Sequence, residues 1–247
     1  MKYFLETSDT IQEGLGFSHF DSLHIAWLLV FAAVTVTCCI VYRKLGEDGR
    51  KKMRYAVASL CVLDEWYMVV CLLIGGNYTP DYLPFHLCSI NIYLIAFHAL
   101  KPNRTLENYL YLVGIPGTLA ALIFPSWVKL PLANFMHLHS FTLHILLVLY
   151  PIMLTAGGDI KPEPRQLPRC LALLLGLAGV ALVVNLIFDT NFMFLMEAKP
   201  GNPLYIFQQL FGNHLIGFPI IITAVILVMY LPGIILKKRR GVHNEAK

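Results

Sequence analysis

The sequence predicts an all-α membrane protein, a polytopic bundle of seven transmembrane helices, on the strength of three observations. Of the 247 residues, 57% are hydrophobic and only 14% are charged, with a mean hydropathy of +0.64, whereas a soluble domain carries about 25% charged residues. The apolar residues fall into seven runs of about the length that crosses a bilayer. The basic residues lie almost entirely in alternate loops. These features exclude a soluble, disordered or fibrous protein.

Residues 1–22 precede the first apolar run and predict an extracytoplasmic N-terminal tail. They carry Glu6, Asp9, Glu13 and Asp21. A secretory signal peptide has a basic start, then an apolar core, then a small-residue cleavage site, and these residues do not show that succession. We therefore expect a short surface segment with an interfacial turn around residues 11–20.

Residues 23–236 predict the seven-helix membrane domain. The fourth run contains Gly114, Pro116 and Gly117, which predict a kinked or tightly packed helix. The apolar segment 204–211 is too short to span, so it predicts a re-entrant or interfacial piece, or the start of a long tilted helix. The seven runs cover residues 23–42, 54–75, 84–100, 106–124, 137–155, 168–189 and 213–236.

The loop charges predict the orientation. Basic residues concentrate in cytoplasmic loops of membrane proteins, so we expect the N-terminus outside and residues 237–247 as a basic cytoplasmic tail. An even number of spans would destroy this asymmetry. The predicted cytoplasmic bases are Arg43, Lys44, Arg50, Lys51, Lys52, Arg54, Lys101, Arg104, Lys161, Arg165, Arg169, Lys237, Lys238, Arg239, Arg240 and Lys247; the remaining three are Lys2, Lys129 and Lys199.

The basic residues predict no nucleic-acid partner. The formal net charge is +4, but the bases occur in short bursts between apolar runs and form no face that a duplex could use. They suit contact with anionic lipid headgroups.

Histidines gather at the predicted outer ends of the helices. Since polar groups that face lipid are costly, we expect them to share a pocket beneath the outer surface. The alternative is that each histidine reaches to the headgroups separately. The outer histidines are His24, His86, His137, His139, His144 and His214.

Two carboxylates, Asp64 and Glu65, lie near the predicted midplane, where ionisable residues are usually functional. They could orient a histidine behind a Cys–His pair, or line a proton or cation path. They could equally be protonated or hydrogen-bonded groups that fix helix packing.

Cys88 is the cysteine best placed for chemistry. It shares a helix face with Asn91, whereas His86 would point about 200° away from it in a regular helix. A base for Cys88 should therefore come from another helix, and the candidates are His144 and His214. A disulfide with Cys71 is a competing interpretation. The histidine spacing matches no helical metal-binding motif, so we expect no metal and no cofactor.

The chain resembles the YwaF family of bacterial integral membrane proteins at three places. They are the stretch Leu83–Cys88, the residue His144, and the segment Asn191–Leu195 followed by Lys199 and Pro200. The resemblance covers roughly residues 15–236. Distant eukaryotic relatives of that family are described as cysteine-dependent acyltransferases acting on ether phospholipids. The resemblance therefore implies that Cys88 is the nucleophile and His144 its base, with membrane phospholipids as partners, in the cell membrane.

These features predict a phospholipid acyltransferase that needs neither metal nor nucleotide. The main alternative is a transporter of a small solute or proton built around Asp64, Glu65 and the histidines, and a seven-helix receptor or scaffold ranks third. The residues expected to bind the lipid are His86, Asn91, His137, Asn191, Asn213 and His214, with Asp64 and Glu65 as supporting carboxylates.

Overall fold

The computed structural model of the chain describes residues 3–199 and 202–245, with side chains up to residue 231. Within these ranges the chain is all-helical, and seven helical stretches are long and apolar enough to cross a membrane. The predicted fold class is therefore confirmed. The stretches are Ser22–Lys44, Glu47–Gly75, Pro80–Leu100, Arg104–Ile123, Phe135–Gly157, Pro164–Phe188 and His214–Leu231.

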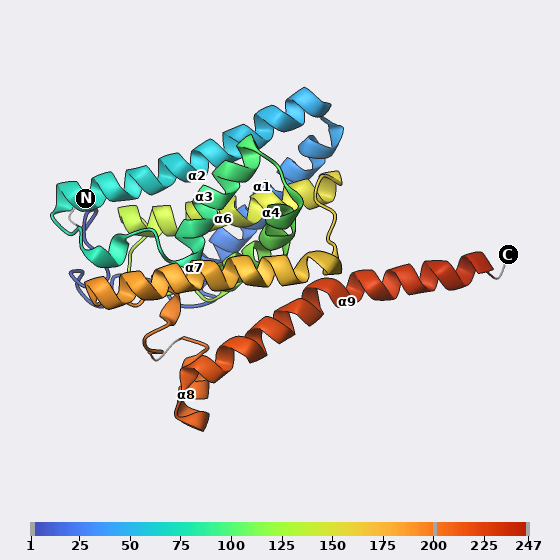
Figure 1. The fold of residues 1–247 in the computed structure, drawn as a ribbon. Coiled ribbons are helices and arrows are strands. Elements are labelled where there is room, and N and C mark those ends of the chain that lie inside the picture. The colour runs from blue at the N-terminus through green and yellow to red at the C-terminus, as the bar shows by residue number, and fades with distance from the viewer. Residues whose placement is uncertain (1–2, 200–201, 246–247) are drawn as a thin grey trace.

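These stretches are built from nine α-helices among the described residues, joined by short 3₁₀ and π-helical turns (Figure 1). The helices are α1 (Ser22–Lys44), α2 (Glu47–Gly75), α3 (Leu87–Leu100), α4 (Arg104–Tyr109), α5 (Ile115–Ile123), α6 (Phe135–Gly157), α7 (Leu167–Phe188), α8 (Tyr205–Phe211) and α9 (Gly217–Glu245).

Helix α6 is the centre of the bundle. In its most apolar stretch 67% of the residues are buried, against 11% in α1 and in α7, so α1 and α7 present most of their surface to lipid. Helices α1, α2, α3 and α5 all pack on α6. The groups that α6 carries are therefore enclosed by helices, where polar side chains must find partners inside the protein.

We call the end of the bundle that holds the loops 43–54, 101–104 and 158–169 the basic end. The opposite end holds residues 3–21, and we call it the N-terminal end. Residues 3–21 do not hang free: Ile11 and Phe17 are buried. Asn134 ties this segment down, because its side-chain amide donates to the carbonyls of Tyr3 and Glu6 while its oxygen caps α6.

The fourth span is irregular, as its glycines and proline predict. A π-helical turn, Leu110–Gly114, joins α4 to α5, and the Ile115 N–H bonds to the carbonyl of Leu110, five residues back. Pro116 directly follows and has no N–H to continue a regular ladder. A π turn inside a helix is one of the identifiable causes of a kink.

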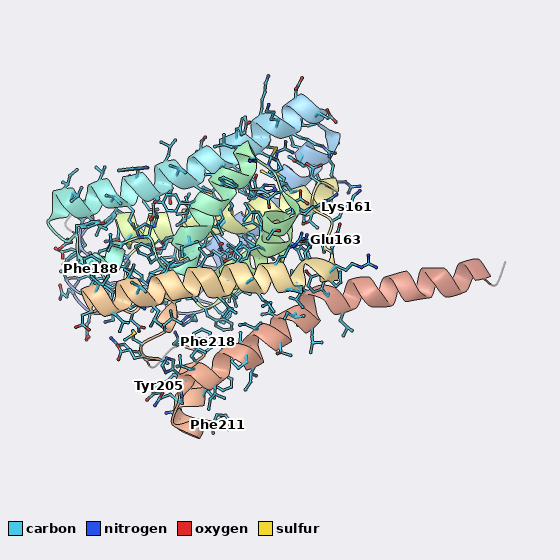
Figure 2. All side chains as sticks on the ribbon, in the orientation of Figure 1. Lys161, Glu163, Phe188, Tyr205, Phe211 and Phe218 are labelled. Carbon is cyan, nitrogen blue, oxygen red and sulfur yellow. The ribbon has the colours of Figure 1, made fainter. Side chains whose placement is uncertain are left out.

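The last part of the chain packs on the bundle through α9, where the Tyr111 hydroxyl donates to the carbonyl of Met229 at 2.8 Å and Tyr230 is buried. Helix α8 is a separate short helix, with Tyr205 and Phe211 at its ends (Figure 2), and it stops where Gly212 takes the left-handed conformation (φ 70°). Helix α9 then runs obliquely away, and its far half projects beyond the other helices (Figure 1). The predicted tail 237–247 continues α9 as helix to Glu245; residues 246–247 lie outside the described ranges.

Candidate functional site

Cys88 lies in the first turn of α3. The chain before it is not helical: His86 has extended backbone angles (φ −66°, ψ 151°) and no side chain caps the helix. Cys88 is the second residue of α3 and Ser89 the third, so the backbone N–H groups of both belong to the free first turn of the helix. Because the first N–H groups of a helix lack intrahelical acceptors, they favour negative charge on a nearby atom. A nucleophilic sulfur is suited to this position.

The two midplane carboxylates on α2 face different partners. Asp64 Oδ2 lies 2.8 Å from His139 Nδ1 on α6, at ion-pair distance, although the ring N–H is not aligned with that oxygen. Glu65, the next residue, is buried between the helices. The site therefore draws on α2, α3 and α6, which pack against one another.

His144 is held in one tautomer on α6. Its Nδ1–H donates to the carbonyl of Ser140 at 2.7 Å, since a carbonyl can only accept. Neutral imidazole then keeps its lone pair on Nε2. The ring stacks on Trp127, with ring centroids 5.1 Å apart, and interacts with His139. Sequence reasoning placed His139 among the outer histidines but gave it no role; its pairing with Asp64 needs the relative rotation of α2 and α6.

A turn between α7 and α8, Phe192–Phe194, covers the start of α3. Phe192 is fully buried against His86, with ring centroids 5.0 Å apart, and the Met193 N–H donates to His86 Nδ1 at 3.4 Å. Asn185 holds the turn through hydrogen bonds to both backbone polar groups of Phe192. Met193 and Phe194 have positive φ, a strained state for residues other than glycine.

The predicted histidine pocket divides into separate groups. His137 and His24 belong to an aromatic cluster around Phe17 and Phe141. Both ring nitrogens of His137 are occupied, since Nδ1–H donates to the Leu130 carbonyl and Nε2 accepts from the Trp27 indole. These bonds tie α1 to α6 and give His137 a structural setting.

Three further predicted binding residues lie in the region after α7 and support its loops. Asn191 accepts from the N–H groups of Met196 and Glu197. Asn213 caps the turn before α9 by accepting from Leu215 N–H. His214 Nε2–H donates to the carbonyl of Phe194. His86, Asn191 and His214 are all linked to the turn Phe192–Phe194, Asn191 through its carbonyl, which accepts from the Phe194 N–H.

All six cysteines are free thiols. Cys71 is buried on α2 with a hydrogen bond to Tyr67, so the structure contains no disulfide between Cys71 and Cys88. Within the described residues, no group of three or more His, Cys, Asp or Glu side chains is arranged to hold a metal ion.

A second polar cluster lies at the basic end. Asp159 bonds to Arg50 at 2.8 Å, to Arg54 at 3.3 Å and to the Tyr42 hydroxyl. His98 on α3 hydrogen-bonds to the Tyr150 hydroxyl on α6 at 2.9 Å. Sequence reasoning assigned these arginines to topology alone. The residue that could have indicated this cluster is Asp159, an acidic residue that follows Gly157 and Gly158 in a loop at the basic end.

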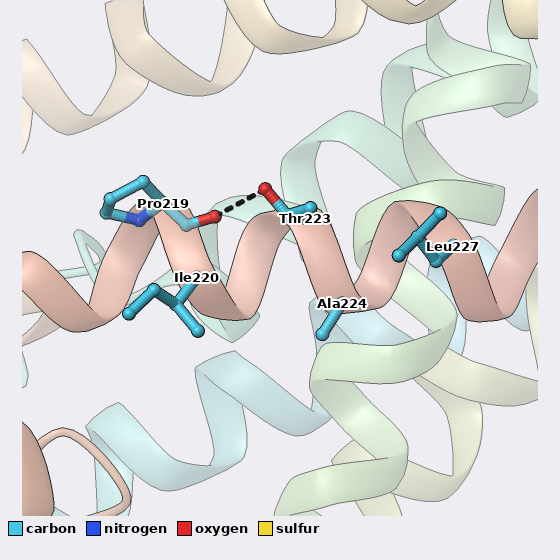
Figure 3. A pocket seen from close by; sticks show the side chains of 5 residues that line it. All are labelled: Pro219, Ile220, Thr223, Ala224 and Leu227. Carbon is cyan, nitrogen blue, oxygen red and sulfur yellow. Dashed lines mark hydrogen bonds between the residues drawn. The ribbon is translucent and has the colours of Figure 1, made fainter.

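An apolar groove runs along α9 (Figure 3). Its only polar side chain, Thr223, donates to the carbonyl of Pro219 at 2.7 Å. All of its lining residues belong to α9: Pro219, Ile220, Thr223, Ala224 and Leu227. It therefore offers a surface for hydrocarbon and no chemistry.

Fold and site together define a multi-pass membrane protein with a thiol, two carboxylates and histidines between its helices, of which Glu65, His139 and His144 are buried. No curated protein and no solved structure matches the chain. The model of the TMEM164 family matches residues 15–230, and the chain belongs to that family.

Proposed function

We propose that the protein is a phospholipid acyltransferase with Cys88 as its nucleophile. The observation that carries the proposal is the free thiol at the uncapped start of α3, a helix that packs against α2 and α6, which carry the buried Glu65 and the Asp64–His139 pair. The resemblance to the YwaF family supports it, because distant eukaryotic relatives of that family are described as cysteine-dependent acyltransferases.

The proposed reaction begins with attack of the Cys88 sulfur on a phospholipid ester carbonyl. His144 Nε2 accepts the thiol proton and later returns it to the leaving alcohol. The N–H groups of the first turn of α3 stabilise the negative carbonyl oxygen, as an oxyanion hole does. They suit this role better than Asn191, Asn213 and His214, which form loop hydrogen bonds. The products are an acyl-thioester and a lysophospholipid; a second lipid alcohol then collects the acyl chain.

Space for the acyl chain is expected beside Gly117 on α5. A Cβ added there would meet only Leu87, at 3.9 Å, which is ordinary contact, and Leu87 precedes Cys88 directly. We predict that Gly117→Phe lowers exchange of long acyl chains about tenfold while short chains are spared, measured as kcat/KM for each chain length. The control is Gly176→Phe on α7, where the added Cβ meets nothing within 4 Å; equal loss of long and short chains would contradict the assignment.

The direct test is to trap the acyl-enzyme. Purified protein in proteoliposomes receives a phospholipid labelled in its acyl chain, without an acceptor. We expect label on the protein that neutral hydroxylamine releases, as it does from a thioester. Label should be absent from Cys88→Ala and retained in Cys71→Ala, a buried cysteine on α2. Equal labelling of Cys88→Ala would refute the nucleophile assignment.

The orientation follows from the loop charges. We infer that the basic end faces the cytoplasm, because cytoplasmic loops retain Lys and Arg, and that the membrane is the cell membrane. Residues 3–21 and the turn over α3 then lie on the outer side, and the lipid substrate enters from the outer leaflet.

A second candidate function is transport of protons. Polar groups lie between α3 and α6, where His98 hydrogen-bonds to the Tyr150 hydroxyl at 2.9 Å, and between α2 and α6, where Asp64 lies against His139. Chains of ionisable residues within a bundle are typical of proton relays. Proton uptake by proteoliposomes under a membrane potential would support this function if a His98→Ala, Tyr150→Phe variant abolished it.

A further inference from the structure

Glu65 is a buried carboxylate without a hydrogen-bond donor for one of its oxygens. Its side chain is only 5% exposed, and in the part of the chain that the structure describes Oε2 has no hydrogen-bond partner. Asp64 Oδ2 also lacks an aligned donor, but it lies at ion-pair distance from His139 Nδ1, 2.8 Å away. Successive helical residues point about 100° apart, so the two carboxylates leave α2 in different directions.

Asn91 presents a second oxygen of the same kind. It lies one turn after Cys88 on α3, is 3% exposed, and its Oδ1 has no partner among the described residues. Two histidines of α6 have other contacts, since His139 lies against Asp64 and the ring of His144 donates to the Ser140 carbonyl. Buried acceptors are nearly always hydrogen-bonded, so this pair of oxygens matches a ligand that donates.

We propose that Glu65 and Asn91 bind the hydroxyl of the acyl acceptor, a lipid alcohol, beside the Cys88 thioester. This inference rests on the proposed acyltransferase function and adds to it the residues that hold the second substrate. The site then has two chemically opposite parts: N–H donors at the start of α3 for the ester carbonyl, and oxygen acceptors for the incoming hydroxyl.

An alcohol fits these oxygens better than the other nucleophiles that attack thioesters. An amine must be neutral to react, and a neighbouring carboxylate would favour its protonated, unreactive form. Water is disfavoured, because Glu65 and Asn91 are enclosed by apolar helices. A hydroxyl stays neutral and donates its single hydrogen to an acceptor oxygen.

The transfer step balances with groups already in the site. The hydroxyl oxygen attacks the thioester carbonyl carbon, a C–O bond forms, and the C–S bond breaks. The hydroxyl proton passes through His144 to the departing sulfur and restores the Cys88 thiol. Glu65 and Asn91 orient the hydroxyl and are acceptor-binding residues, which affect the second half-reaction and not the first.

The test separates the two half-reactions in proteoliposomes. Thioester is first formed from acyl-labelled phospholipid, and its discharge is then timed after addition of a lysophospholipid. We expect Glu65→Ala and Asn91→Ala to form thioester at the wild-type rate. Their discharge should slow about 10- to 100-fold, the range for losing one hydrogen bond to a charged or buried group, with a raised KM for the lysophospholipid. Glu65→Gln keeps an acceptor oxygen and should recover most of the rate.

The control variant is Thr35→Val. Among the described residues, Thr35 on α1 also has a buried hydroxyl without a hydrogen-bond partner. Its replacement removes such a group away from the proposed site, so both half-reactions should keep their rates. Normal discharge by Glu65→Ala and Asn91→Ala overturns the inference but leaves the proposed function intact. Absence of thioester in the wild-type protein overturns the function itself.

A measurement on the unmodified protein decides the matter even where a variant does not fold. A deoxy analogue of the lysophospholipid lacks only the hydroxyl and cannot react. The inhibition constant of the deoxy analogue should be at least about tenfold higher than the dissociation constant of the lysophospholipid, because the analogue leaves both oxygens without a donor. Equal constants for the analogue and the lysophospholipid would show that these oxygens do not bind the hydroxyl.

Discussion

Replacement of Cys88 by alanine is expected to lower acyl exchange between phospholipids by at least about 10³-fold, the scale on which removal of a nucleophile acts. The reason is chemical: the proposed acyl-thioester cannot form without the sulfur, and the hydroxyl of the neighbouring Ser89 is a much weaker nucleophile than a thiol at neutral pH. The measurement is transfer of a labelled acyl chain between two phospholipid species in proteoliposomes, followed by lipid separation.

The matched control is Cys71→Ala. Cys71 is also a buried free thiol, but it lies on α2 beside Tyr67, so its loss should change exchange less than about twofold. Exchange by the Cys88→Ala protein at the wild-type rate would end the nucleophile assignment. It would shift the interpretation towards proton transport along α2, α3 and α6.

Replacement of Asp159 by alanine is expected to destabilise the bundle by about 2 kcal/mol. Asp159 is the shared partner of Arg50, Arg54 and the buried Tyr42 hydroxyl. Its loss leaves two guanidinium groups partly enclosed without their anion. Breaking a buried pair costs about 3–5 kcal/mol, and partial exposure of these side chains to solvent reduces that cost. The midpoint of thermal unfolding in detergent should fall by about 4–8 °C.

The control is Glu197→Ala. Glu197 also forms an ion pair at 2.8 Å, with Lys199, but the two side chains are 54% and 74% exposed. Exposed pairs contribute about 0–1 kcal/mol, so unfolding should shift little. Equal shifts in the two variants would show that the cluster at the basic end does not hold α1, α2 and α6 together.

The histidines show how far sequence reasoning reaches. Helical spacing predicts that His137 and His144 share a face of one helix, which says where each ring points relative to its own axis. It cannot say which neighbouring helix supplies Trp27 to His137 or Asp64 to His139. Those pairings depend on how α1 and α2 are rotated and shifted against α6. The sequence suggested one shared pocket; in the structure the rings of His137 and His144 join one aromatic cluster through Phe141 and Trp127, whereas His139 lies against Asp64.

The seven membrane spans and the irregular fourth helix were readable from the chain itself, because they depend on local quantities: the length of an apolar run, and a proline that lacks an N–H. The environment of each buried polar group was decided only by tertiary packing. Neighbouring residues such as Asp64 and Glu65 differ in partner because of their angle on α2, and that angle acquires chemical meaning only when α3 and α6 pack against it.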